Sequence, residues 1–270
     1  MAFKIGFTAE HNENNSAEGT YTAQQQTSPR KSVVQIYFDD RNMTLAYYND
    51  RFDLHRGDMV YVDGKLEGML GCVTEVNYNF KIKISDYKRV IAVADTTVHG
   101  KFFIADGCFV TFDREALPSS KVVRWFKAPA NEGEEIVSGS DNTTFRLEDI
   151  KNMKVSYSHK EFDNEQYYGN NVRYISLDGI RGYAIVEGHK AYEVEFEYCN
   201  GEINGLVCSC FNSDNCKHEF AAMLLLKEML ELIEKNYADE YERSGYFAAI
   251  NKRTLFNFAV CGKDSGTFML

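Results

Sequence analysis

The stretch AYEVEFEYCNGEINGLVCSCFNSDNCKHEFAAMLLLKEMLELIEK, residues 191–235, decides the fold of the C-terminal half of the chain. Its first residues alternate apolar and acidic side chains, which is typical of a half-buried β-strand. Asn200 and Gly201 then form a hairpin-turn pair, and a second strand returns from there to Cys208 and Cys210. The apolar run after the cysteines carries charged residues at intervals, which predicts a long helix.

Four potential metal ligands lie within this stretch: Cys208, Cys210, Cys216 and His218. Alternate residues of a strand point to the same face, so the thiols of Cys208 and Cys210 can reach one ion. Two helical residues separated by one other lie about 200° apart, so Cys216 and His218 must precede the helix or lie in its first turn. Free backbone N–H groups there can hydrogen-bond the cysteine sulfurs.

These four ligands fill a tetrahedral zinc shell and leave no position for water. We therefore predict one structural Zn²⁺ per chain at Cys208, Cys210, Cys216 and His218. The alternative interpretation is a group of buried or reactive cysteines beside a surface histidine. The chain has 7 cysteines, an odd count that disfavours a complete set of disulfides.

Composition limits the class of protein. The chain has 270 residues, of which 44% are hydrophobic, enough for one large or two ordinary domains with packed cores. With a net charge of −10, the chain lacks the general positive potential that drives non-specific nucleic-acid binding. No apolar run is long enough for a secretory signal or a membrane span, so we expect a cytoplasmic protein that does not bind membranes.

The sequence of the N-terminal half predicts short β-strands separated by turns. Examples are VVQIYF (33–38), MVYV (59–62) and the alternating FKIKI (80–84). Asp63-Gly64 predicts a two-residue hairpin turn. Strands this short and this closely spaced indicate a small β-barrel or sandwich, and the segment from residue 57 to 76 resembles the SH3-like barrels of small adaptor domains.

The chain is therefore predicted to divide into four parts. Residues 8–32 are polar, without apolar periodicity, and residues 1–32 are expected to form a disordered arm. Residues 33–126 form the small barrel. Residues 127–151, which are acidic in their central part, form a linker, and residues 152–270 form an α+β domain that contains the cysteine cluster. The expected fold class is mainly β, or α+β.

A basic segment of the predicted barrel is a candidate nucleic-acid surface. It contains Lys81, Lys83, Lys88 and Arg89, with aromatic residues beside them. A basic strand with neighbouring aromatics is typical of barrels that bind nucleic acids, because phosphates contact the bases and nucleobases stack on the rings. The alternative is an ordinary solvated strand face.

The cysteine cluster, placed after an alternating hairpin and before a helix rich in alanine and leucine, resembles a SWIM-type zinc finger. The segment 170–198 is similar to the strands that precede this finger in bacterial members. The resemblance covers about residues 165–235. It implies a small ββα unit and binding of DNA or protein rather than catalysis.

The predicted finger is acidic, which favours a protein partner over DNA or RNA. Its acids are Glu193, Glu195, Glu197, Glu202, Asp214 and Glu219, and its bases are Lys190 and Lys217. No nucleophile–base pattern and no phosphate-binding glycine loop is recognisable in the sequence. We therefore expect a non-enzymatic, zinc-binding adaptor without a small-molecule substrate, and keep nucleic-acid binding by the barrel as the alternative.

Overall fold

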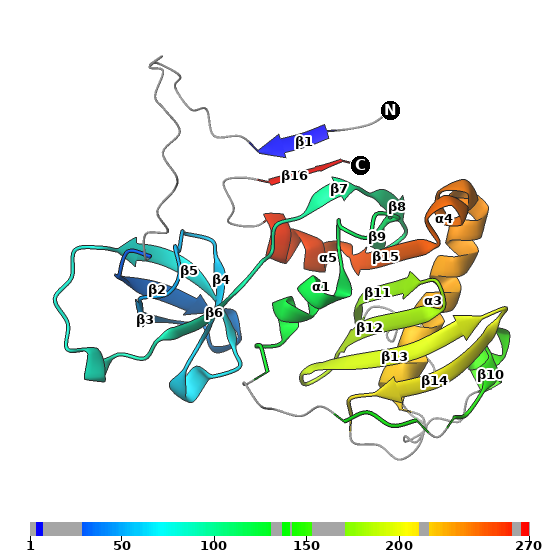
Figure 1. Cartoon of the computed structure of the whole chain (residues 1–270), viewed down its shortest axis with the longest axis horizontal. Helices are drawn as coiled ribbons and strands as arrows, with labels where there is room; N and C mark the ends of the chain where they lie inside the picture. Colours follow the sequence, from blue (N-terminus) through cyan, green and yellow to red (C-terminus); the bar gives the residue numbers. More distant parts are fainter. Residues whose placement is uncertain are drawn as a thin grey trace, which may run out of the picture.

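The computed structural model describes residues 4–7, 29–130, 137–140, 142–152, 171–210, 216–260 and 266–269. These residues form three β-sheets, and helices pack on the largest. Figure 1 shows a five-stranded sheet from the N-terminal half beside a larger sheet that carries most of the C-terminal half. The expected mainly β, α+β class is confirmed.

The larger sheet has eight strands in the described residues, and every neighbouring pair is antiparallel. In spatial order they are β10 (Phe145–Arg146), β14 (Glu202–Cys208), β13 (Ala191–Cys199), β12 (Arg181–Glu187), β11 (Val172–Asp178), β15 (Tyr246–Asn251), β9 (Cys108–Thr111) and β8 (Phe103–Ala105). The central strands are apolar on both faces, as expected for strands that are covered on both sides.

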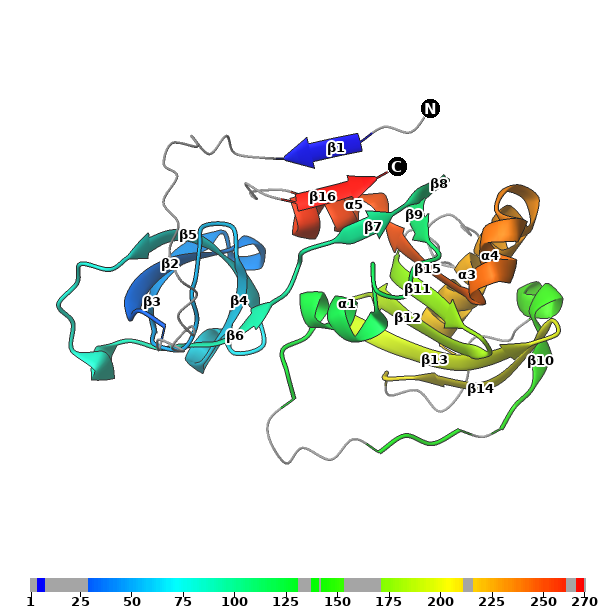
Figure 2. The ribbon, with the colours of Figure 1, turned by 45° about the horizontal axis from the view of Figure 1, so that its top comes forward.

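Helices cover both faces of this sheet. The long helix α3 (Lys217–Asn236) packs on one face, where Ile175 of β11 is buried. The helix α1 (Ser119–Phe126) packs on the other face, where its Trp125 is buried in the same cluster as Tyr174 of β11. Figures 1 and 2 show α1 and α3 on opposite sides of the strands. The core is thus two apolar layers, one on each side of the sheet.

The hairpin of β13 and β14 has the predicted form. Tyr192, Val194 and Phe196 are buried, whereas Glu195 and Glu197 are exposed. The turn at Asn200-Gly201 has positive φ at both residues, 50° and 86°, as a type I′ turn requires. One face of β13 therefore packs in the core and the other faces solvent, as the alternation in the sequence predicts.

A glycine permits close packing inside the larger sheet. Gly182 of β12 lies opposite Phe196 of β13. A Cβ atom at Gly182 would lie 2.0 Å from the Phe196 ring, which is far inside van der Waals contact. The aromatic ring fills the space that a side chain at residue 182 would need.

The five-stranded sheet is formed by β3 (Met43–Asn49), β2 (Ser32–Phe38), β5 (Leu70–Asn77), β4 (Met59–Val62) and β6 (Val90–Ala94), in this spatial order. Alternate residues of β2, Val34, Ile36 and Phe38, are fully buried. They form a separate apolar cluster with residues such as Val60 and Val73. This small core matches the strand periodicity of the sequence.

The predicted closed barrel is not found in the described residues. The edge strand β3 is joined to the residues directly before β6 by one isolated bridge between Tyr48 and Arg89, where the Tyr48 amide donates to the Lys88 carbonyl over 2.9 Å. No continuous ladder joins the two edges, so the sheet curls but stays open.

Three local predictions in the N-terminal half were wrong. Residues 80–84 form no strand, because no neighbouring strand in the described part pairs with their alternating residues. The connection from β4 to β5 is longer than a two-residue turn and contains the 3₁₀ turn Gly64–Leu66. The strands β8 and β9, which were expected in the barrel, pair in the eight-stranded sheet, since their apolar residues complete its core.

Polar contacts at helix α1 link the five-stranded sheet to the larger one. The hydroxyl of Tyr61, on β4, donates to the carbonyl of Arg124 in α1 over 3.0 Å. The indole of Trp125 donates to the carbonyl of Asp95, directly after β6, over 2.8 Å. Lys121 forms an ion pair with the Asp95 carboxylate at 2.8 Å. Helix α1 therefore connects the small core with the larger one.

A third sheet joins the two ends of the described chain. Its strands are β1 (Lys4–Phe7), β16 (Gly266–Met269) and β7 (His99–Lys101), with β16 in the middle. The predicted disordered arm, residues 1–32, contains strand β1 and the start of β2, and its residues 1–3 and 8–28 lie outside the described residues. Both figures show β1 and β16 side by side.

Shorter elements complete the described structure. They are α4 (Ala238–Ser244), α5 (Lys252–Leu255), a π-helical turn (Phe256–Val260) and 3₁₀ turns at Asp39–Arg41, Ile84–Asp86 and Leu147–Asn152. The last of these directly follows the short strand β10. None of the described helices is both long and apolar enough to cross a membrane.

Candidate metal centre

The four side chains singled out in the sequence lie together. Cys208 ends strand β14, and Cys210 follows two residues later. Cys216 is the N-cap residue of α3, and His218 lies in the first turn of that helix. One ligand atom from each of the four lies within 4.8 Å of the others, so the cluster could hold a single metal ion.

Two separations from His218 agree with a tetrahedral metal site. With Zn–S bonds of about 2.3 Å and Zn–N bonds of about 2.0–2.1 Å, neighbouring ligand atoms of a tetrahedron lie roughly 3.5–3.8 Å apart. Nδ1 of His218 lies 3.7 Å from Sγ of Cys208 and 3.7 Å from Sγ of Cys216. One ion could therefore contact the imidazole and both thiols without a large rearrangement.

Cys216 is held in place by the start of α3. Its Sγ accepts a hydrogen bond from the backbone N–H of Glu219 at 3.4 Å. In return, the Glu219 carboxylate accepts a hydrogen bond from the Cys216 backbone N–H at 2.8 Å. This reciprocal pair is a capping box with cysteine in the place usually taken by serine or threonine. The expected N–H donation to a cysteine sulfur is present.

An aromatic side chain fixes the histidine. The ring of Tyr192, from β13, stacks on the ring of His218 with 3.9 Å between the centroids and 22° between the planes. The Tyr192 hydroxyl lies 2.9 Å from both ring nitrogens of His189. Gly188 lies beside this stack, where a Cβ atom would come within 3.1 Å of the Tyr192 ring and 3.4 Å of Nε2 of His218.

The protonation of these groups suits metal binding. Burial, with help from the charges of Lys217 and His189, lowers the pKa of His218 to about 4, so the imidazole is neutral at physiological pH. Burial and the Cys216 thiol raise the pKa of Cys210 to about 11. A hydrogen bond with Cys208, together with burial, raises the pKa of Cys216. A cation must therefore displace thiol protons when it binds.

The four bases of the predicted nucleic-acid surface have different surroundings. Lys81 and Lys83 are exposed on the loop after β5, and the side chain of Lys83 is 79% exposed and near Asp86. The Lys88 stem lies against Gly64. Arg89 forms an ion pair with Asp50 and lies over the ring of Tyr48. The four bases thus lie on the segment that connects β5 with β6, and a role in nucleic-acid binding stays a prediction.

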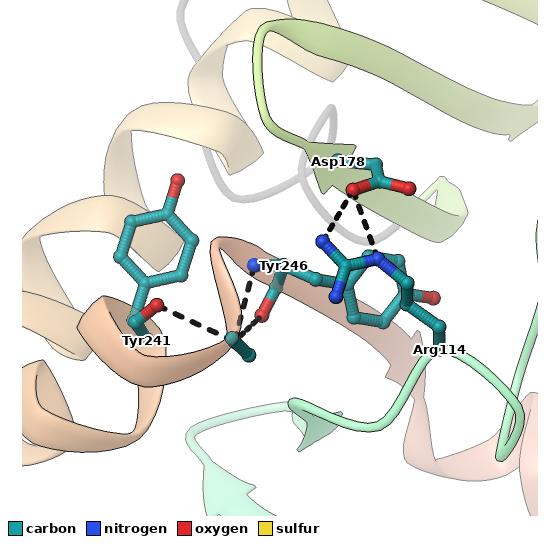
Figure 3. Close-up of polar contacts among 5 residues, drawn as sticks. Arg114, Asp178, Tyr241 and Tyr246 are labelled. Carbon is teal, nitrogen blue, oxygen red and sulfur yellow. Dashed lines mark hydrogen bonds and ion pairs between the residues drawn. The ribbon is translucent and has the colours of Figure 1, made fainter.

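A cleft lies between the edge of the larger sheet and α4. This cleft of about 310 Å³ is lined by Lys101, Phe103, Phe112, Asp113, Glu240, Arg243 and Ser244. Figure 3 shows polar contacts among Arg114, Asp178, Tyr241 and Tyr246, which do not line the cleft. Arg114 donates twice to the Asp178 carboxylate and lies over the Tyr246 ring. The Ser244 hydroxyl donates to the Tyr246 carbonyl at 2.8 Å, which ties the end of α4 to β15.

Sequence reasoning missed the residues that support the histidine. Tyr192 fits the apolar period of its strand, and Gly188 and His189 lie in the turn before it, so no local pattern connects them with His218. The one available signal is that Tyr192 and Cys208 stand on the same face of adjacent strands, since Val194, two residues from Tyr192, pairs with Cys208.

The chain matches none of the protein families, curated proteins or solved structures with which it was compared.

Proposed function

We propose that this protein binds one structural Zn²⁺ through Cys208, Cys210, Cys216 and His218, as a SWIM-type zinc-binding adaptor without enzymatic activity. The observation that supports it is the convergence of three thiols and one imidazole, with candidate ligand atoms within 4.8 Å of one another. Three sulfurs and one nitrogen in this arrangement suit zinc better than magnesium or calcium, which prefer oxygen ligands.

A structural role follows from the number of ligands. Four protein ligands complete the tetrahedral shell of zinc, whereas catalytic zinc sites keep a position for water. The ion would join the end of β14 to the start of α3, and would so fix the angle between the hairpin and the helix. The ββα arrangement of the SWIM type is consistent with this element order, although here the hairpin is part of a larger sheet.

Metal analysis tests the proposal directly. We expect one zinc per chain in protein purified without chelators, measured by elemental analysis and by native mass spectrometry. Cys210→Ser should lower the zinc content. Cys199→Ser is the matched control, because Cys199 is exposed and lies outside the cluster, and should leave the zinc content unchanged. Zinc-free parent protein, or full retention in Cys210→Ser, would contradict the proposal.

The adaptor role concerns the outer face of β13. Glu195 and Glu197 are exposed there, and such a face repels phosphate backbones and favours a protein with basic side chains. Affinity purification from the source cell, with and without nuclease, should recover the same partner protein both times. Glu195→Lys combined with Glu197→Lys should remove that partner. Loss of the partner on nuclease treatment would instead favour a nucleic-acid tether.

The alternative function is nucleic-acid binding by the N-terminal sheet. It is favoured by the guanidinium of Arg30, 4.4 Å from the ring centre of Tyr78, and by the neighbouring exposed Lys81 and Lys83. Binding of single- or double-stranded DNA or RNA should weaken steeply with salt. It should be lost in Lys81→Glu combined with Lys83→Glu. No binding by the parent protein at low salt would rule this function out.

A further inference from the structure

We propose that Tyr192 and Gly188 hold the imidazole of His218 so that Nδ1, and not Nε2, is the metal ligand. This inference rests on the zinc site proposed above, and it makes Tyr192 and Gly188 positioning residues for that site. It specifies which atom of the histidine the ion contacts and which residues outside the ligand set determine this choice.

The first part of the argument is the direction of the ring. Nδ1 of His218 lies 3.7 Å from the sulfurs of both Cys208 and Cys216, as expected for two edges of a tetrahedron. Nε2 points to the other side, where it faces Gly188. A half-turn of the ring about its bond to Cβ would move Nδ1 away from the thiols and would not bring Nε2 to the same place, because the two nitrogens lie at different distances from the backbone.

The second part is the stack that keeps this orientation. The Tyr192 ring lies nearly parallel to the His218 ring with 3.9 Å between the centroids. Tyr192 is itself fixed, since only 4% of it is exposed and its hydroxyl contacts the His189 ring. A flat, immobile surface against one face of the imidazole opposes rotation of the ring, in the way that outer residues commonly orient histidine ligands.

The third part is the absence of a side chain at Gly188. A Cβ atom here would lie 3.1 Å from Tyr192 and 3.4 Å from Nε2 of His218. The separation from Tyr192 is tighter than ordinary van der Waals contact, and the separation from Nε2 is at the lower limit of that contact. Gly188 is not among the residues with positive φ, so the backbone itself would accept alanine. The space around the two rings is therefore the reason why this position suits glycine.

The nitrogen of His218 that binds the metal can be identified by NMR spectroscopy in the protein without substitutions. Long-range ¹H–¹⁵N correlation spectra of zinc-loaded protein labelled on histidine should show that Nδ1 of His218 is bound to metal and Nε2 carries the proton. A spectrum in which Nε2 is the bound nitrogen would overturn the inference. If the parent protein bound no zinc at all, the proposed zinc binding itself would be wrong. Failure of the ligand-atom inference is thus distinguishable from failure of the proposed function.

The positioning role is tested with four variants, by competition with a chromophoric chelator. Tyr192→Ala removes the stacked ring and Gly188→Ala crowds it, and each should weaken zinc binding by about 10–100-fold, the usual effect of disturbing residues that orient a metal ligand. Tyr192→Phe retains the stack and should bind nearly as the parent does. Gly107→Ala is the control for glycine replacement, because a Cβ atom at Gly107 would meet nothing within 4 Å.

A spectroscopic measurement separates positioning from general destabilisation. With Co²⁺ in place of zinc, the visible ligand-field bands of Gly188→Ala and Tyr192→Ala should differ from those of the parent, while Tyr192→Phe should restore the parent spectrum. Circular dichroism of the metal-free variants should confirm that they remain folded. Parent-like affinity and spectra in both Tyr192→Ala and Gly188→Ala would contradict the inference.

Discussion

Two substitutions of Cys216 should separate its two contributions to stability. The Cys216 sulfur caps α3 and is also a candidate metal ligand. Cys216→Ser keeps a side-chain acceptor for the Glu219 N–H, since serine is a preferred N-cap residue, whereas Cys216→Ala removes the acceptor. Both variants lose the thiolate. They are therefore expected to differ from one another without metal and to resemble one another in their response to zinc.

The expected magnitudes follow from these contacts. Loss of an N-cap acceptor costs about 1 kcal/mol, so Cys216→Ala should have a free energy of unfolding lower than that of Cys216→Ser by this amount. When free zinc exceeds the dissociation constant of the parent protein 100-fold, the parent should gain about 2.7 kcal/mol. Neither variant should gain a comparable amount, because each retains only the other three ligands.

Urea unfolding followed by far-ultraviolet circular dichroism measures these differences, once with a strong chelator and once with buffered zinc. Cys199→Ser is again the control and should respond to zinc as the parent does. Equal stability of the serine and alanine variants in chelator would show that the cap contributes nothing. A zinc response in either variant as large as that of the parent would show that Cys216 is not a ligand.

Three further changes probe the framework of the site. Gly182→Ala should destabilise the protein by about 1–3 kcal/mol, because its Cβ atom would lie 2.0 Å from Phe196; a midpoint of thermal unfolding equal to that of Gly107→Ala would contradict this. Tyr61→Phe should cost about 1 kcal/mol, because the Arg124 carbonyl loses its donor; unchanged urea stability would show that this bond is dispensable. Burial alone would raise the pKa of Glu193, but Lys127 and Tyr183 outweigh it and lower the pKa below the usual 4.5. The stabilisation lost in Glu193→Gln should therefore be present above pH 4.5 and disappear as the pH falls through the lower folded value; an equal difference at pH 7 and at pH 3 would refute this.

Patterns confined to neighbouring residues predicted the local structure well. The alternation of Tyr192, Val194 and Phe196 with glutamates identified β13, and Asn200-Gly201 identified its turn. The same reasoning brought Cys208 and Cys210 to one face and placed Cys216 and His218 at the start of a helix. Each of these features depends on periodicity or turn chemistry within a few residues, which a single sequence contains.

Long-range pairing could not be predicted in the same way. Residues 80–84 alternate as a strand does, yet they form no strand. A strand needs a neighbouring strand with which to pair, and the local sequence pattern does not identify such a partner. The short apolar strands β8 and β9 would suit either sheet by composition, and their place was decided by the core around β15. The stack of Tyr192 on His218 likewise depends on how a hairpin and a helix meet in space.

The strand order of the larger sheet has a consequence for synthesis of the chain. Strand β15, near the C-terminus, lies between β9 and β11, which are separated by a long stretch of sequence. A growing chain therefore exposes one unpaired edge of β9 and one of β11 until residues 246–251 have left the ribosome, and such edges invite aggregation. Cys208, Cys210, Cys216 and His218 emerge earlier than β15. A cation bound to them could therefore already hold the hairpin to the first turn of α3 before β15 completes the middle of the sheet.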